Sequence, residues 1–266
     1  MEKNKTEKPQ QEQPKFQFPT EEVTLPSKGA LYSTNSLLSK GVIEMKYMTA
    51  KEEDILTNQN FIKNGTVINR LLKSLIVSDI NYNDLLLGDK NAILIAARIL
   101  GYGADYEFMY THPQTGEDEK VCVNLSEVED MELNTDLIKN GKNEFEFELP
   151  FSKILLTFKL LTHGDEQKID QELKGLKKIN KNASAELTTR LKHLVLSVNG
   201  DYSQKTIREF VDNAFLARDA KALRNYMGSI MPDADLKFDL EFEDGYIEDN
   251  VVIPLGASFF WPDVEL

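Results

Sequence analysis

Cysteine and long apolar runs are the scarcest features of this 266-residue sequence. Its single cysteine, Cys122, excludes an intrachain disulfide and fits a reducing compartment. The longest apolar stretches, residues 92–100 and 154–162, are about half as long as a membrane-spanning helix, and each contains a basic residue. The first 20 residues are polar and lack the apolar core of a signal peptide. We therefore expect neither membrane insertion nor a signal peptide.

Basic residues are outnumbered, since 31 Lys and Arg against 44 Asp and Glu leave a formal net charge of −13. Phosphate binding needs clustered Lys and Arg, so this charge argues against nucleic-acid binding and against anionic membrane surfaces. It suits a protein that stays soluble until it meets a protein partner. The length allows one large domain or two small ones, with a core that needs no disulfide or metal.

No catalytic constellation is visible in the sequence. The three histidines, His112, His163 and His193, have no nucleophile or metal-ligand partner at a useful spacing, and we expect them at the surface. Cys122 has no identifiable activating base, so a buried structural thiol is expected. The sequence predicts no catalytic, cofactor-binding or metal-binding residue. Clustered carboxylates, as at residues 241–245, leave a carboxylate-dependent hydrolase as a minor alternative.

Hydrophobic periodicity predicts a mixture of helices and hairpins. A capping box formed by Thr49 and Glu52 marks one helix start. Helices are expected at residues 50–57, 67–76, 89–100, 163–198 with a break around 177–182, and 204–231 with a break near Arg218. Strands and hairpins are expected at residues 22–25, 42–48, 105–125, 144–149, 152–162 and 235–255.

The two halves of the chain share an order of elements and several identical residues. From residue 89 to 125 an offset of 130 residues holds without a gap and pairs Asp89 with Asp219. The pattern favours an internal duplication, although helix pairs and hairpins also resemble one another through patterning alone. We predict an α+β fold of two similar modules, residues 21–140 with a hairpin at 105–125 and residues 141–266 with a hairpin at 235–255.

Aromatic residues near both ends are candidates for partner binding. Residues 1–20 are rich in Lys, Glu, Gln and Pro and are predicted to be a disordered tail, in which Phe16 and Phe18 could dock on a partner. Near the other end, Phe259, Phe260 and Trp261 form a cluster typical of interface anchors. These three residues could equally be core anchors of the last strand, and the sequence leaves both alternatives open.

Four segments carry a family resemblance: LPSKGALYS at 25–33, GVIEMKYMTAKEEDIL at 41–56, LLLGDKNAILIAARILGYGADYEF at 85–108 and IPLGASFFWP at 253–262. With VINRLLKSLI at 67–76, they resemble the baseplate hub assembly proteins of T-even-type contractile-tailed bacteriophages. Some members of that family carry a Cys-Pro-x-Cys-Gly knuckle in the hairpin. Here residues 112–116 read HPQTG, and Thr115 cannot replace a thiolate. The resemblance therefore implies degenerate, metal-free hairpins derived from a zinc-ribbon-like knuckle.

The resemblance also implies a function without catalysis or cofactors. The chain would assemble the baseplate hub or remain in it as a structural subunit, with other tail baseplate or hub proteins as partners. It would act in the host cytoplasm during assembly and, as a permanent subunit, in the virion tail baseplate. An adaptor of a system unrelated to phage, built on the duplicated module, is the main alternative.

Overall fold

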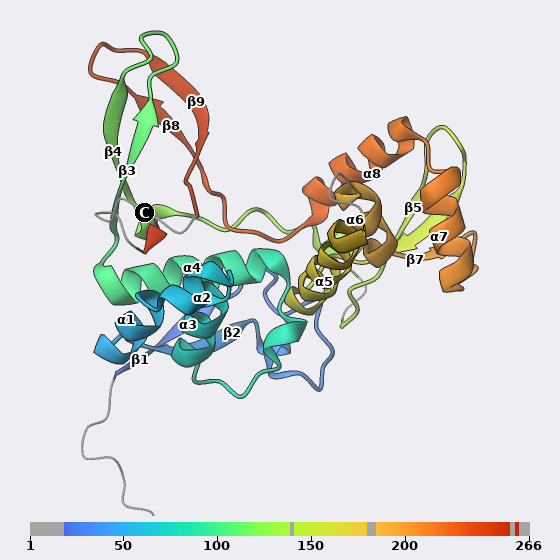
Figure 1. Ribbon diagram of the computed structural model, residues 1–266, viewed down its shortest axis with the longest axis horizontal. Coiled ribbons are helices and arrows are strands. Elements are labelled where there is room, and N and C mark those ends of the chain that lie inside the picture. The colour runs from blue at the N-terminus through green and yellow to red at the C-terminus, as the bar shows by residue number, and fades with distance from the viewer. Residues whose placement is uncertain (1–18, 139–140, 180–184, 256–258, 261–266) are drawn as a thin grey trace, which may run out of the picture.

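The computed structural model describes residues 19–138, 141–179, 185–255 and 259–260. They form a mixed α+β fold with small antiparallel sheets, as predicted. Figure 1 shows an N-terminal lobe and a C-terminal lobe side by side, and two β-hairpins standing together above helix α4 (Leu87–Tyr102). Most of the predicted tail, residues 1–18, lies outside the described residues.

The N-terminal lobe packs helices on a two-stranded sheet. Strands β1 (Thr20–Thr24) and β2 (Val42–Lys46) pair antiparallel, and β2 buries Ile43 and Met45 on one face. The long helix α4 ends at Gly103, whose φ of 88° ends the helical backbone. The remaining helices of the lobe are α1 (Ala50–Leu56), α2 (Gln59–Lys63) and α3 (Val67–Leu75), with short 3₁₀ turns η1 (Leu37–Lys40) and η2 (Tyr82–Asp84).

The C-terminal lobe contains a three-stranded sheet in the order β5 (Phe145–Glu148), β6 (Leu155–Phe158), β7 (Val195–Val198). Strand β7 contradicts the sequence prediction, which extends a helix to residue 198. The helix instead ends at Leu194, and the four following residues pair with β6 to complete the sheet. The helices are α5 (His163–Ile179), α6 (Glu186–Leu194), α7 (Gln204–Asn213) and α8 (Ala217–Ile230).

The same arrangement of polar contacts begins a helix in each lobe. At α1, the Thr49 backbone N–H and hydroxyl donate to the Glu52 carboxylate at 3.1 and 2.5 Å, and Lys46 Nζ lies 2.8 Å from it. At α5, the Thr162 backbone N–H and hydroxyl donate to the Asp165 carboxylate at 3.2 and 3.0 Å, and Lys159 Nζ lies 2.7 Å from that carboxylate. Both carboxylates have pKa values below their usual range: burial opposes the shift, but these donors outweigh it.

A buried aspartate ties an upstream Leu-Pro turn to a long helix in each lobe. Asp89 on α4 accepts hydrogen bonds from the Ser27 backbone N–H at 2.9 Å, the Ser27 hydroxyl at 2.7 Å and the Tyr32 hydroxyl. Asp219 on α8 accepts from the backbone N–H groups of Phe151 and Ser152 at 2.9 and 3.0 Å. Both aspartates are fully buried. In both turns a lysine has a left-handed backbone, with φ of 50° at Lys28 and 59° at Lys153.

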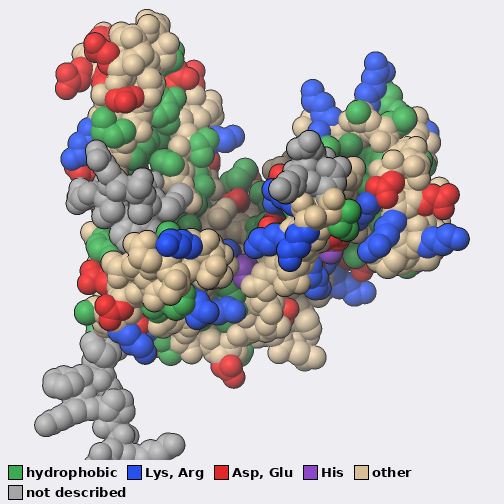
Figure 2. Space-filling model, viewed as in Figure 1, with side chains coloured by type: hydrophobic (Ala, Val, Ile, Leu, Met, Phe, Trp, Pro, Cys, Tyr) green, Lys and Arg blue, Asp and Glu red, His purple; other side chains and the backbone are tan. Residues whose placement is uncertain are grey.

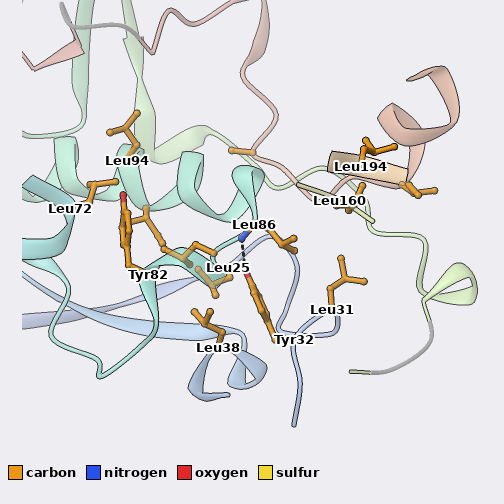
Figure 3. Close-up of a cluster of buried hydrophobic side chains, with 14 of the residues drawn as sticks. Leu25, Leu31, Tyr32, Leu38, Leu72, Tyr82, Leu86, Leu94, Leu160 and Leu194 are labelled. Atoms are coloured by element: carbon orange, nitrogen blue, oxygen red, sulfur yellow. Dashed lines mark hydrogen bonds between the residues drawn. The ribbon is translucent and has the colours of Figure 1, made fainter. Parts of the chain in front are cut away.

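One apolar core runs through both lobes. Figure 3 shows Leu160 and Leu194 from the C-terminal lobe beside the leucines of the N-terminal lobe, and the Leu86 N–H donates to the Tyr32 hydroxyl at 3.0 Å. Backbone contacts join the lobes as well, because the His163 N–H donates to the Leu85 carbonyl at 2.7 Å. The lobes therefore form a single packed unit at the start of α4 and α5.

His163 lies at this junction and predicts acid sensitivity. Its side chain is 2% exposed, lies edge-on to Tyr82 at 4.6 Å between ring centroids, and has Lys90 Nζ 3.5 Å from Nδ1. Burial, then Lys90 and Lys73, lowers its pKa to about 4, against a smaller opposing effect of Asp170. Between pH 6.5 and 4, His163 is protonated in the unfolded chain but stays neutral in the folded chain. The free energy of unfolding therefore falls as the pH falls.

We expect His163 to contribute a loss of about 2 kcal/mol of stability between pH 7 and pH 4.5, after allowance for solvent screening. Denaturant unfolding across that range would measure it. His163→Gln should flatten the slope, because the variant has no imidazole at the lobe junction to take up the proton. Equal slopes in the wild type and His163→Gln would refute the assignment.

Candidate functional site

The two hairpins form one body, which we call the hairpin pair. It consists of β3 (Asp105–Thr111) with β4 (Asp118–Asn124) and β8 (Lys237–Glu241) with β9 (Ile247–Val252). Phe108 and Phe238 meet between the ribbons with ring centroids 6.3 Å apart. Each residue is the counterpart of the other in the 130-residue offset, so the two ribbons pack through matching positions.

The tips of the two hairpins have similar turns. In the first, the His112 N–H donates to the Glu117 carbonyl at 2.8 Å and the Gly116 N–H donates to the His112 carbonyl at 2.9 Å. In the second, Phe242 occupies the place of His112. Its N–H donates to the Tyr246 carbonyl at 2.9 Å, and its carbonyl accepts from the Gly245 N–H at 2.9 Å. Both glycines have positive φ, which a residue with a Cβ adopts less readily.

His112 is buried at the tip, and the expected surface position is wrong. Its ring lies 4.2 Å from that of Phe242 and 5.2 Å from that of Tyr246. Its Nδ1 accepts the backbone N–H groups of Gln114 and Thr115 at 3.1 and 3.3 Å. The ring is held by the turn that it belongs to and by the opposite tip, which the sequence could not reveal. His163 is likewise buried, at the lobe junction.

The hairpin pair and the segments that flank it carry the negative charge of the protein. Residues 103–132 and 231–255 together contain seventeen Asp and Glu but only two Lys, a net charge of −15 against −13 for the whole chain. The rest of the chain is therefore close to neutral, and Figure 2 shows Lys and Arg gathered over the C-terminal lobe and Asp and Glu at the end of the hairpins. Such a local field favours basic partners.

A groove of about 530 Å³ lies between β4 and β8. Cys122 lines it and is exposed, which contradicts the expected burial. The reason is alternation: Val121 points into the core, so its neighbour points outward. The other lining residues are Val123, Asn124, Glu127, Val128, Glu129, Asp235, Lys237, Phe238, Asp239, Leu240 and Ile253.

The terminal aromatics are partly within the described residues. Phe259 and Phe260 are 0% and 1% exposed, and the Phe259 ring lies 4.8 Å from that of Tyr106. This burial favours the core alternative for these two residues and gives no support to a binding role. Phe16, Phe18 and Trp261 lie outside the described residues, so their role in partner binding stays a prediction.

Phe259→Ala should therefore destabilise the protein by about 3–5 kcal/mol, since it deletes a fully buried ring. Chemical denaturation monitored by circular dichroism would measure the loss. Phe151→Ala is the matched control because that ring is 54% exposed, and we expect it to cost less than about 1 kcal/mol. Similar small losses in both variants would place Phe259 outside the core.

A metal-ligand cluster and a membrane-spanning helix are both missing from the described part of the chain. No group of three or more His, Cys, Asp or Glu there could hold a metal ion. No described helix is long and apolar enough to cross a membrane. The hairpin pair, with its groove and its charge, is the candidate site.

Comparison with known proteins identifies a family. No curated protein and no solved structure matches the chain. The family model described as "T4 bacteriophage base plate protein" matches residues 20–261, which include both lobes and the hairpin pair. This match confirms the family resemblance, whose segments lie between residues 25 and 262. The chain belongs to the T4 bacteriophage base plate protein family.

Proposed function

We propose that the protein builds the hub of a phage tail baseplate without catalysing a reaction, either as a structural subunit of the contractile tail or as an assembly chaperone. Family membership supports a phage baseplate role. The observation that carries the finer proposal is the hairpin pair, because it joins concentrated negative charge to an open groove. Its partners would be other baseplate or hub proteins, met in the host cytoplasm.

Mass spectrometry of gradient-purified particles and of infected-cell lysate tests the proposal. Stoichiometric peptides of this chain in particles would establish a virion baseplate subunit. Peptides that co-purify with hub proteins in lysate but are missing from particles would establish a chaperone that leaves before completion. Absence from both particles and hub complexes would overturn the proposal and favour the adaptor alternative.

We also propose that the chain arose by internal duplication, with the unit boundary near residue 140. The paired contacts support it: Thr49 with Glu52 corresponds to Thr162 with Asp165, and Asp89 corresponds to Asp219. A second correspondence supports the duplication. In the N-terminal lobe, Ile76 directly follows α3 and bridges to β2, and in the C-terminal lobe β7 directly follows α6 and pairs with β6. Shared patterning alone does not demand matching buried hydrogen bonds.

The hairpin pair would then descend from facing zinc-ribbon-like knuckles, with rings in place of a metal. In support, His112 and Phe242 occupy matching turn positions, and their rings contact each other with centroids 4.2 Å apart and planes tilted by 57°. We expect purified protein to contain less than about 0.1 zinc per chain by elemental analysis, since a structural site needs four ligands. EDTA should leave the melting temperature unchanged. Stoichiometric zinc, or melting in EDTA, would contradict this derivation.

A further inference from the structure

The groove between β4 and β8 runs along strand edges. Consecutive residues line it, 122–124 from β4 and 237–240 from β8. Because successive side chains of a strand point to opposite faces, a cavity that touches consecutive residues follows the edge of the strand. Both strands belong to two-stranded sheets, so each has one edge unpaired within its sheet.

The base of the groove is closed by backbone pairing. The Met131 N–H donates to the Asp233 carbonyl at 2.8 Å, and the Asp235 N–H donates to the Glu129 carbonyl at 2.7 Å. The bridge between Asp130 and Ala234 lies between these bonds. Beyond the bridge, β4 and β8 pair with their own hairpin partners and not with each other. The ribbons are therefore joined at one end and separated by the groove above it.

The lining combines an apolar surface with an acidic border. Val123, Phe238 and Leu240 are partly buried and Ile253 is buried, which provides contact area for aliphatic side chains. Exposed Glu127, Glu129, Asp235 and Asp239 surround them, and Lys237 is the only basic residue among those lining the groove. A ligand that fits all three features has main-chain groups for the edges, aliphatic side chains for the surface and cations for the border.

We propose that this groove binds an extended partner segment in which Lys or Arg alternates with aliphatic residues, by addition of a strand to β4 or β8. The inference rests on the proposed baseplate role, and the segment would belong to another tail protein. A second copy of the chain is a poor occupant, because its residues 103–132 and 231–255 bring the same charge of −15. Alternation supplies cations on one side and aliphatic groups on the other, as a strand requires.

Fluorescence anisotropy with a labelled octapeptide of alternating lysine and valine tests the proposal on the full chain. We expect saturable one-to-one binding. A glutamate–valine octapeptide should bind at least about a hundredfold more weakly through charge repulsion. A lysine–valine peptide with alternate amides N-methylated keeps its charge but lacks half of the N–H donors that pair with a strand edge. Its affinity should be at least about tenfold lower. Equal binding of the methylated peptide would overturn strand addition.

Matched charge reversals locate the binding. Glu127→Lys with Glu129→Lys changes the groove border, whereas Glu117→Lys with Glu243→Lys makes the same charge change at exposed tip positions. The double variant at the groove should lower the affinity for the lysine–valine peptide at least about tenfold. The double variant at the tips should lower it less than about threefold, because salt screens distant charges. Unchanged melting temperatures would show that both proteins fold. Equal weakening, or no binding by the wild type, would overturn the groove assignment while the particle measurement remained interpretable.

Discussion

Asp89→Ala is expected to destabilise the protein by about 3–5 kcal/mol, since it leaves three buried donors of Ser27 and Tyr32 without their acceptor. Burial raises the pKa of Asp89 although the donors oppose this shift, so the site tolerates the carboxyl only with its partners in place. Asp89→Asn keeps one acceptor oxygen, so its loss of stability should be smaller than that of Asp89→Ala. Urea denaturation of the three proteins would give the values.

Asp84→Ala is the control for that measurement, because Asp84 is exposed and lies five residues earlier in the chain. A change within about 0.5 kcal/mol is expected there. Asp219→Ala should reproduce much of the Asp89 loss, since two backbone N–H groups then lose their acceptor. A loss below about 1 kcal/mol at Asp89 would show that water replaces the carboxylate and that the turn does not depend on it.

Gly88→Ala should cost about 3 kcal/mol or more, because the added methyl group would lie 1.8 Å from the Pro232 carbonyl oxygen. Gly88 is in the first turn of α4, where the linker from α8 to β8 crosses the helix. Backbone atoms meet there, so rotation of a side chain cannot relieve the clash. Asn91 Nδ2 holds the same linker through Asp233 at 3.0 Å, which leaves the linker little freedom to move.

Gly228→Ala provides a control of opposite sign. Gly228 lies within α8 and a Cβ there meets nothing within 4 Å. Alanine in a helix interior is about 0.5–1 kcal/mol more favourable than glycine, so this variant should be stabilised. Thermal and urea unfolding of both variants would decide the matter. A neutral Gly88→Ala would mean that the linker and α4 separate readily, and that the hairpin pair is not fixed to the lobes.

Local sequence signals were enough for elements whose determinants are close in the chain. The Thr49–Glu52 capping box predicts the start of α1 because its donors and acceptor are three residues apart. Alternation predicts that β2 is a strand with at least one buried face, since side chains of a strand change face at every residue. The 130-residue offset pairs Asp89 with Asp219, but their burial depends on donors that lie 57 to 68 residues earlier in the chain.

Only the tertiary structure decided which surfaces meet. Alternation predicts that a hairpin has an apolar face. It does not predict that the second hairpin covers the first and encloses His112. The same holds for His163, whose burial depends on Tyr82 and Lys90 from the other lobe. Strand β7 was missed because four residues after a helix carry too short a pattern, and pairing with β6 defines them. The groove exists because two ribbons joined at their base remain unpaired above it, a long-range outcome with no local signature.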